Sequence, residues 1–438
     1  MASVGEGHSA TCAWMSGRIL GWTSDSFRIT LMAGILGSVL LSSGFPSVVG
    51  GQQPERSLPT EWILAQEPTL ILGGRSGSGS RVSEGVFGAA WAPDGSALVA
   101  VAVAGEIQRF AMDGTHLGTL GGRGFGPGEF QFILGVFLGP GDTIWGVKQT
   151  GGISGFHGGK HQRDLTLNGR DPIGWIGNRL ISEGALPSNR KPLEPIPSGM
   201  HQSLWSIVSH AADGSDAETL LRGLGRERYL IDDPRVWDRP AIYREPHVAL
   251  GTNFIAYAYG GSEDLQLLDA SGDTLNSIPL KVISGEEFQA LASARLEARI
   301  RLSTPERRPV VRPVLEAIPL PEWVADISDL AVDSHDRIWV RRMTWPEDSF
   351  ARWDVFERSG HLVARIDIPV RLKVHGISGE MLLASERDPE GVYAVLAYRI
   401  VCRHLEDTLA THLRPRPLFP SQAWTGPTPV QWTGEYCG

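Results

Sequence analysis

Eight polar residues stand at or just before the strands that open the repeated units of this sequence, and their side chains could do chemistry. They are Glu84, Glu129, Asp171, Arg244, His247, Asp326, Lys373 and His375. Carboxylates and imidazoles exchange protons and coordinate divalent metals. Together with cationic side chains they can also bind a polar ligand. We nominate Glu84, His247 and His375 as metal ligands or general bases. The alternative is that the eight are solvated loop residues or partners of one another.

No motif of a known catalytic centre accompanies these residues. The zinc motif HExxH, the phosphate loop GxxxxGK and the nucleophile elbow GxSxG are all missing from the sequence. The glycine runs at 73–79 and 121–128 lack the helix, lysine or spacing of a nucleotide-binding loop, so we interpret both as linkers. The Asp-Gly pairs at Asp94, Asp113 and Asp213 are isolated, which favours turns over calcium sites.

A repeated unit of short strands and tight turns must position the polar residues. A strand, a turn of two to five residues and a second strand recur six times, at 86–103, 133–147, 173–182, 248–259, 327–341 and 374–385. A second hairpin follows most of the first ones, and two hairpins make a four-stranded sheet, the size of a propeller blade. The 53 glycines suit such turns, because glycine tolerates positive φ.

The sixth unit lacks an obvious fourth strand, and the N-terminal end of the chain offers one. Residues 69–75 (TLILGGR) share their Gly-Gly-Arg ending with 119–123 (TLGGR), the end of the first blade. We therefore predict that residues 69–72 pair with the last blade and close the ring, which would satisfy both open strand edges. The alternative is that the tail around 401–405 supplies this strand.

Two segments interrupt or follow the repeat. Residues 284–323 are predicted to be a helical insertion, in which Ser284 and Glu287 form a capping box and Pro305, Pro309 and Pro313 end the helix. Residues 401–438 form a proline-rich C-terminal extension.

The ends of the chain suggest export. The apolar run at 31–41 follows Arg28 and has the length of a signal-peptide core, so residues 1–52 are interpreted as a signal peptide or leader, with an uncleaved anchor as the alternative. Export would place the protein in the periplasm or outside the cell, where Cys402 and Cys437 could form a disulfide. The net charge of −9 gives no reason to expect nucleic acid as a partner.

The segment GGRGFGPGEF at 121–130 resembles the linker between blades in exported bacterial six-bladed propellers of the NHL-like or TolB-like class. The segments DLQLLDASGDTL, DLAVDSHDRIWVRR and WDVFERSGHLVARIDIP are similar to the second half of the same family. The resemblance covers residues 60–400 and implies an all-β fold, a six-bladed β-propeller of four-stranded antiparallel blades with one helix inserted between blades four and five. It also implies that the eight polar residues converge on the mouth of a central channel.

Two classes of function follow from this sequence. The first is a binding scaffold for a small polar ligand or a protein, with Glu84, Glu129, Arg244, His247, Lys373 and His375 as the candidate ligand-binding residues. The alternative is a lactonase-like propeller hydrolase or lyase with a polar or metal site at the channel. No cofactor is predicted, although a divalent metal in the channel stays open, and we expect a monomer.

Overall fold

The computed structural model describes residues 59–75, 81–149, 151–168, 170–185, 198–230, 237–238 and 240–403. The predicted leader at 1–52 and all but the first three residues of the predicted extension at 401–438 lie outside these residues. The described chain is mostly β-strand. None of its helices is long and apolar enough to cross a membrane.

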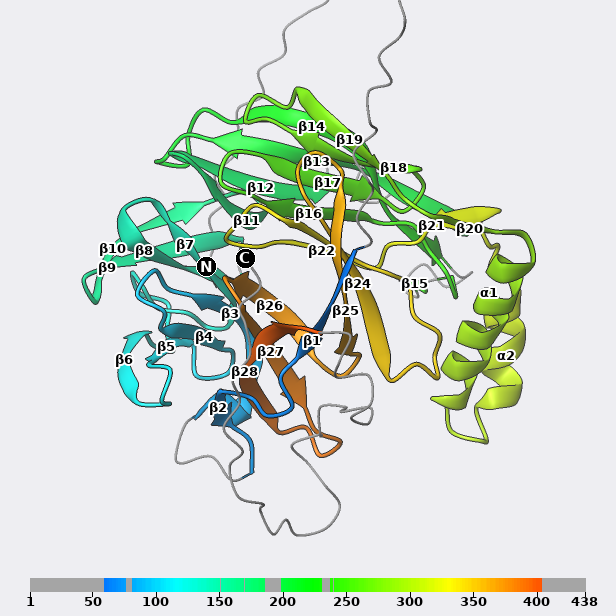
Figure 1. Cartoon of the computed structure of the whole chain (residues 1–438), viewed down its shortest axis with the longest axis horizontal. Helices are drawn as coiled ribbons and strands as arrows, with labels where there is room; N and C mark the ends of the chain where they lie inside the picture. The colour runs from blue at the N-terminus through cyan, green and yellow to red at the C-terminus, as the bar shows by residue number, and fades with distance from the viewer. Residues whose placement is uncertain are drawn as a thin grey trace, which may run out of the picture. The chain divides into compact units, whose positions relative to one another are not determined.

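The first two sheets have four antiparallel strands each, and the strands follow one another in chain order (Figure 1). The first contains β3 (Val86–Trp91), β4 (Ala97–Val101), β5 (Glu106–Phe110) and β6 (His116–Gly121). The second contains β7 (Ile133–Gly139), β8 (Thr143–Lys148), β9 (Gly152–His157) and β10 (Lys160–Thr166). Two short 3-10 helices, η1 (Arg81–Glu84) and η2 (Pro140–Asp142), stand before β3 and between β7 and β8.

The next two sheets repeat this pattern, and the third is enlarged. It contains β11 (Asp171–Ile176), β12 (Arg179–Ala185), β13 (Gly199–His210), β14 (Glu218–Leu230) and the short edge strand β15 (Trp237–Asp238). The fourth contains β16 (Pro246–Leu250), β17 (Ile255–Tyr259), β18 (Asp264–Leu268) and β19 (Thr274–Pro279). The long strands β13 and β14 pair over nearly their whole length, so they form a hairpin that extends beyond the rest of the sheet.

The last two four-stranded units are joined by the N-terminal strands. One contains β22 (Asp329–Val332), β23 (Ile338–Arg341), β24 (Phe350–Phe356) and β25 (Leu362–Pro369). The other contains β26 (Lys373–Ser378), β27 (Met381–Arg387), β28 (Tyr393–Cys402) and β2 (Leu70–Gly73). The strand β1 (Thr60–Leu64) pairs in parallel with β25 and antiparallel with the end of β28, so it lies between the two units (Figure 1).

The strand predicted at 69–72 corresponds to β2, and it pairs with β28 in the register Leu70 to Ala397 through Gly73 to Ala394. The tail strand considered as the alternative is not a separate strand, because Val401 and Cys402 continue β28. The side chains of β2 alternate, with Leu70 and Leu72 buried and Ile71 exposed. The two leucines pack in one core cluster with residues of β3, β4 and β28, which ties the N-terminal segment to the last strands of the chain.

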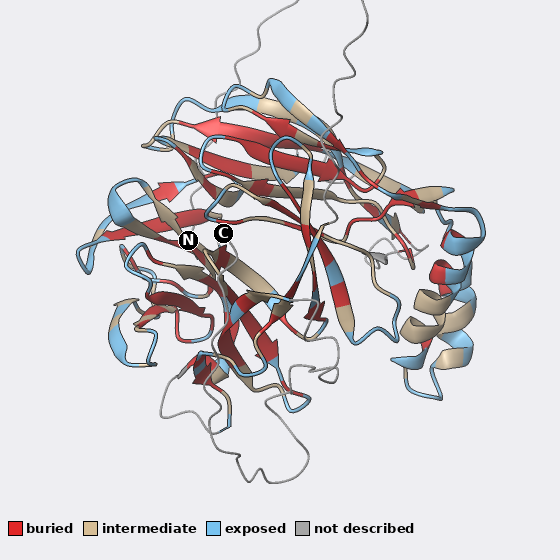
Figure 2. Ribbon diagram, viewed as in Figure 1, coloured by how far each residue is buried: buried red, intermediate tan, exposed pale blue. Residues whose placement is uncertain are grey.

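The innermost strands contact one another in a closed cycle. β3 contacts β7, β7 contacts β11, β11 contacts β16, β16 contacts β22, β22 contacts β26, and β26 contacts β3. Buried apolar side chains fill the spaces between neighbouring sheets, and Figure 2 shows them concentrated on the strands. Radial packing of twisted four-stranded sheets around an axis is the architecture of a β-propeller.

Glycine permits the closest approach between two innermost strands. A Cβ atom on Gly88 of β3 would lie 2.9 Å from the α-carbon of Gly135 in β7. No side chain could stand between these two strands without forcing them apart, because real Cβ atoms do not approach backbone atoms so closely. The first two sheets therefore meet backbone to backbone next to the axis.

The insertion contains two helices, whereas one was predicted. α1 (Gly285–Arg301) and α2 (Arg308–Glu316) lie between β20 (Val282–Ser284) and β21 (Trp323–Ala325), which pair as a two-stranded ribbon. The prolines do not exclude a second helix, because Pro309 stands in the first turn of α2, where its missing N–H costs no helical hydrogen bond. The predicted capping box is also wrong, since Ser284 makes no side-chain cap hydrogen bond. Glu287 instead pairs with Lys281, with Nζ and Oε1 2.7 Å apart.

The Asp-Gly pairs form turns, as the sequence predicted. The Oδ1 atoms of Asp94, Asp113 and Asp213 each accept a hydrogen bond from the backbone N–H two residues further on, at 2.9–3.1 Å. A carboxylate used in this way stabilises the turn between two strands.

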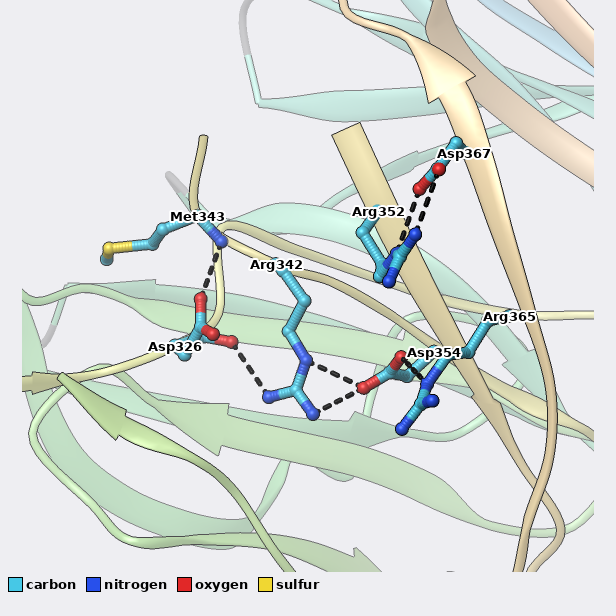
Figure 3. Close-up of polar contacts among 7 residues, drawn as sticks. All are labelled: Asp326, Arg342, Met343, Arg352, Asp354, Arg365 and Asp367. Atoms are coloured by element: carbon cyan, nitrogen blue, oxygen red, sulfur yellow. Dashed lines mark hydrogen bonds and ion pairs between the residues drawn. The ribbon is translucent and has the colours of Figure 1, made fainter. Parts of the chain in front are cut away.

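A buried ion network crosses the fifth four-stranded unit (Figure 3). The Arg342 guanidinium binds the buried Asp354 carboxylate, with Nε 2.8 Å from Oδ2, and donates to the backbone carbonyl of Asp326 at 3.3 Å. Arg365 Nε lies 3.4 Å from the other oxygen of Asp354. Arg352 and Asp367 form a separate pair that is about half exposed. Through Arg342, the residue that follows β23, the network joins β24 and β25 to the linker before β22.

Candidate functional site

The innermost strands all begin at one end of the propeller axis. Each unit has four main strands and therefore begins and ends at the same side, and short linkers such as 370–372 lead to the next innermost strand. We call this end of the axis the mouth. Asp171, Asp329 and Lys373 are the first residues of β11, β22 and β26, so they stand at the mouth.

A cavity of about 360 Å³ lies among the innermost strands, a volume within the usual range for small-ligand pockets. Residues of β7, β11, β16, β22 and β26 line it. Its larger apolar side chains are Phe137, Leu138, Ile173, Trp175, Leu250, Leu330, Val332, Trp353 and Val374. Asp329 and His375 are the titratable residues among those that line it. Most of the residues that line the cavity are apolar, but its exposed surface is more polar than apolar, and its one acidic residue, Asp329, lies at the mouth.

A group of charged side chains, the mouth cluster, lies beside the channel on the third and fourth sheets. It consists of Asp171, Glu183, Arg226, Glu245 and His247. Asp171 and Glu183 face each other in the register of β11 and β12. Arg226 of β14 forms an ion pair with Glu245, which precedes β16. The long β14 is therefore the element that brings a cation to this group of acids.

Glu183 has the most unusual proton affinity of the described carboxylates. The pKa of Glu183 is raised from the ordinary value of 4.5 to about 7, mainly by burial and also by the neighbouring carboxylates of Asp171 and Glu245, while Arg226 opposes the rise. Such a carboxyl group is partly protonated at neutral pH. It could donate or accept a proton there, which an ordinary glutamate does poorly.

The pKa of Glu183 gives a testable pH dependence of stability. Between about pH 4.5 and pH 7 the folded protein keeps the proton on Glu183 while the unfolded chain releases it, so the free energy of unfolding should fall as the pH rises through this window. Glu183→Gln stays neutral, and we expect it to be more stable than the natural protein at pH 8 by up to about 3 kcal/mol and no more stable at pH 4.5. Urea unfolding at both pH values measures the difference. The exposed Glu218→Gln serves as the control, and an equal gain in both variants would contradict the assignment.

The two nominated histidines are held neutral. Burial lowers the pKa of His247 to about 4, helped by Arg226, and lowers the pKa of His375 to about 3, helped by Lys373. His375 Nε2 lies 2.8 Å from the hydroxyl oxygen of Ser385. Both imidazoles can form hydrogen bonds at neutral pH, but such low pKa values make them poor general bases there.

Asp329 joins the mouth cluster to the cavity. Its Oδ1 accepts a hydrogen bond from the Leu330 backbone N–H at 2.9 Å. Burial raises its pKa, with Arg341 and Lys373 opposing that rise and Glu245 adding to it. Asp329 therefore lies within electrostatic reach of charged residues of both neighbouring innermost strands, Lys373 at the start of β26 and Glu245 just before β16.

The other residues nominated from sequence mainly have structural partners. Glu129 accepts the backbone N–H of Gly126 at 2.8 Å, and Lys373 Nζ donates to the carbonyl of Phe87 at 3.3 Å. Arg244 donates to the carbonyl of Trp323 and stacks on its ring at 5.2 Å, which fixes the β20–β21 ribbon. Glu84 is exposed in η1.

Asp326, the remaining nominated residue, is buried and accepts the backbone N–H of Met343 at 2.8 Å. Of the eight residues, Asp171, His247 and His375 are the ones that adjoin the mouth cluster or line the cavity.

Glu84, His247 and His375, nominated together as ligand or base, stand on η1, β16 and β26. Within the described ranges, no group of three or more His, Cys, Asp or Glu side chains is arranged to hold a metal ion. Cys402 is a disulfide cysteine. Its predicted partner, Cys437, lies outside the described residues, so that pairing stays a prediction.

Sequence reasoning missed Glu183, Arg226, Glu245 and Asp329. One of them, Asp329, carried a signal, because it opens an innermost strand just as Asp171 does. Counting back across the Gly177-Asn178 turn would have placed Gly184 opposite Asp171, and only the irregularity between Pro172 and Gly174 brings Glu183 into that place. No sequence signal pointed to Arg226, because the length of β14 and its contact with the fourth sheet depend on tertiary structure.

No family model matches the sequence, and no curated protein matches it. Solved structures do resemble the chain. A member of the DUF4221 family from Bacteroides vulgatus has a TM-score of 0.42 at 11% identity, over 79% of this chain and all of that one. A gluconolactonase from Xanthomonas campestris has a TM-score of 0.39 at 13% identity, over 78% and 99% of the two chains. A streptogramin B lyase has a TM-score of 0.38 at 10% identity, over 75% and 87%. At this level of likeness no activity carries over to the chain.

Proposed function

We propose that the chain is an exported six-bladed β-propeller that binds a small ligand in its central channel. The closed cycle of six innermost strands supports the blade count. The observation that carries the binding proposal is the cavity of about 360 Å³, which is lined by apolar side chains together with Asp329 and His375 and has the mouth cluster beside it. A ligand that fits has an apolar body for the channel and polar groups for the mouth.

A thermal-shift screen of small amphipathic compounds tests binding. Compounds that bind in the channel should raise the melting temperature of the natural protein, and Gly376→Leu should abolish the rise by filling the cavity. A Cβ atom on Gly376 has room, since its nearest neighbour is Trp91 Cδ1 at 3.7 Å. Asp367→Asn changes a half-exposed side chain of β25 that does not line the cavity, so it should leave the rise unchanged. A rise that survives Gly376→Leu would place the ligand elsewhere and contradict the proposal.

Acid–base catalysis is the second candidate, favoured by one observation. Glu183 has a pKa of about 7 and faces Asp171, so it can give or take a proton at neutral pH next to a second carboxyl group. The reaction class would be a hydrolysis or an elimination. If a bound compound is turned over, Glu183→Gln should lower the turnover rate at least 100-fold while binding persists. Unchanged turnover in that variant would leave binding as the function.

Export belongs to the proposal because the predicted leader at 1–52 and the disulfide cysteine Cys402 both suit an oxidising compartment. N-terminal sequencing of the protein recovered from outside the cytoplasm of a bacterial host tests it. A mature protein that begins near residue 52 supports export, and full-length protein found in the cytoplasm opposes it.

A further inference from the structure

The turn between α1 and α2 is the outer end of the helical insertion. The two helices lie side by side, because Ile300 of α1 packs with Leu315 of α2 and Arg312 pairs with Glu297 across them (Figure 1). The other ends of both helices lead into the β20–β21 ribbon. α1 has 17 residues, so its last turn lies roughly 25 Å from that ribbon. We call residues 301–310, which form this outer end, the helical tip.

The helical tip and the helix face next to it expose large apolar side chains. Leu302 is 88% exposed and Val310 is 72% exposed. Val314, which is 36% exposed, lies on the same face of α2 as Val310, because the two are four residues apart. Figure 2 shows the surface of both helices as mostly exposed or intermediate. Single exposed apolar residues are ordinary, but several gathered at the end of one hairpin indicate a surface for interaction.

The helical tip is positively charged, although the whole chain has a net charge of −9. It contains Arg301, Arg307 and Arg308 and one acidic residue, Glu306. The exposed side chain of Arg307 has no hydrogen bond or ion pair with any residue that the structure describes. Arg308 donates to two backbone carbonyls of the turn at 3.1 Å, which leaves its charge uncompensated. Arg301 lies 3.7 Å from Glu347, and both side chains are exposed, so this ion pair is weak.

Arginines next to protruding apolar side chains match the surface of an anionic bilayer. Apolar side chains can enter the boundary between headgroups and acyl chains while the guanidinium groups stay with the anionic headgroups. A stable protein partner would need a complementary surface of about 800 Å² on each side, which a single turn of chain does not offer. The acidic remainder of the protein is repelled by the same bilayer, so the helical tip is the part that can approach it.

We propose that the helical tip docks the protein on the surface of an anionic lipid bilayer. Leu302 and Val310 would lie among the lipids, and the arginines of the helical tip would lie among the headgroups. Because few side chains take part, the association is peripheral, reversible and weakened by salt. The inference goes beyond the proposed function and does not depend on a ligand in the channel.

Flotation of the full chain with lipid vesicles tests the docking. We expect tighter binding to vesicles of phosphatidylglycerol and phosphatidylcholine in equal parts than to vesicles of phosphatidylcholine alone, and a loss of that difference in high salt. The natural protein and all variants carry the apolar run at 31–41, so any affinity of this run for lipid cancels between them. Equal binding to the two kinds of vesicle, or binding to neither, would overturn the proposal.

Neutral variants test the charge of the helical tip. Arg307→Gln should weaken binding to the anionic vesicles roughly fivefold, since each arginine near such a surface contributes about 1 kcal/mol. Arg399→Gln is the matched control, because Arg399 is an exposed arginine on β28, in the last four-stranded unit. It should leave the binding unchanged. Equal losses in the two variants would mean that net charge alone sets the affinity, which would overturn the role of the helical tip.

Polar variants test the apolar side chains. Leu302→Ser should weaken binding to the anionic vesicles about tenfold, because the buried leucine is lost from the bilayer. Leu275→Ser on β19 is the control, since Leu275 is also a half-exposed leucine but lies outside the insertion. Substitutions at such exposed positions should not impair folding. Unchanged binding of Leu302→Ser would overturn insertion, and so would an acidic protein that binds the helical tip while vesicles fail to compete. Thermal shifts by channel ligands should be the same in all these variants, so the proposed function is tested separately.

Discussion

Replacing Leu72 by alanine is expected to lower the free energy of unfolding by about 2–5 kcal/mol. Leu72 is 4% exposed and stands on β2, the strand that completes the last four-stranded unit. Its side chain packs in the cluster that also holds Val86 and Val395, from opposite ends of the chain. The alanine would leave a cavity where the two ends of the chain meet, and urea unfolding measures the loss.

The neighbouring residue provides a control within the same strand. Ile71 is 45% exposed and faces the other side of β2, so Ile71→Ala removes a similar number of atoms without opening the core. We expect a loss below about 1 kcal/mol. Equal losses in the two variants would mean that the pairing of β2 with β28 does not hold the fold together.

Replacing Arg342 by methionine is expected to cost about 3–5 kcal/mol, because it leaves the carboxylate of Asp354 buried without its main partner. Asp354 is 4% exposed, and the remaining cation, Arg365, lies 3.4 Å from Oδ1 (Figure 3). The carbonyl of Asp326 also loses a donor. The free energy of unfolding at neutral pH is the measurement.

The Arg352–Asp367 pair on the same strands is the matched control. Both side chains are about half exposed, with Nε and Oδ1 2.9 Å apart. Water replaces a partner at such a site, so Arg352→Met should cost no more than about 1 kcal/mol. If Arg342→Met lowered the free energy of unfolding as little as Arg352→Met does, the ion pair of Arg342 and Asp354 would not act as a buried pair, which would contradict its proposed role in stabilising this unit.

Much of the architecture could be predicted because local rules determine it. The alternation of buried and exposed residues, together with turns such as Met112-Asp113-Gly114, defines each hairpin without reference to the rest of the chain. The Gly-Gly-Arg repeat indicated where β2 belongs. The second helix was missed because Pro309 can begin a helix as well as end one, and only packing decides between the two.

The site was harder to predict because its residues meet through tertiary structure. His375 and Asp171 could be nominated from their places at the starts of innermost strands. Arg226 could not, since it reaches Glu245 only through the long β14. Trp175, which lines the cavity, packs on Trp145 of a different sheet, and no local pattern indicates this contact.

Crystals of the protein soaked with a set of small fragments that carry polar groups give the most direct test of the channel as a ligand site. We expect fragments in the cavity between β22 and β26, within the closed cycle of innermost strands, with polar atoms in hydrogen-bond contact with Asp329 or His375. Fragments that bind only on outer surfaces while the cavity stays free of them, or innermost strands that do not close, would contradict the account.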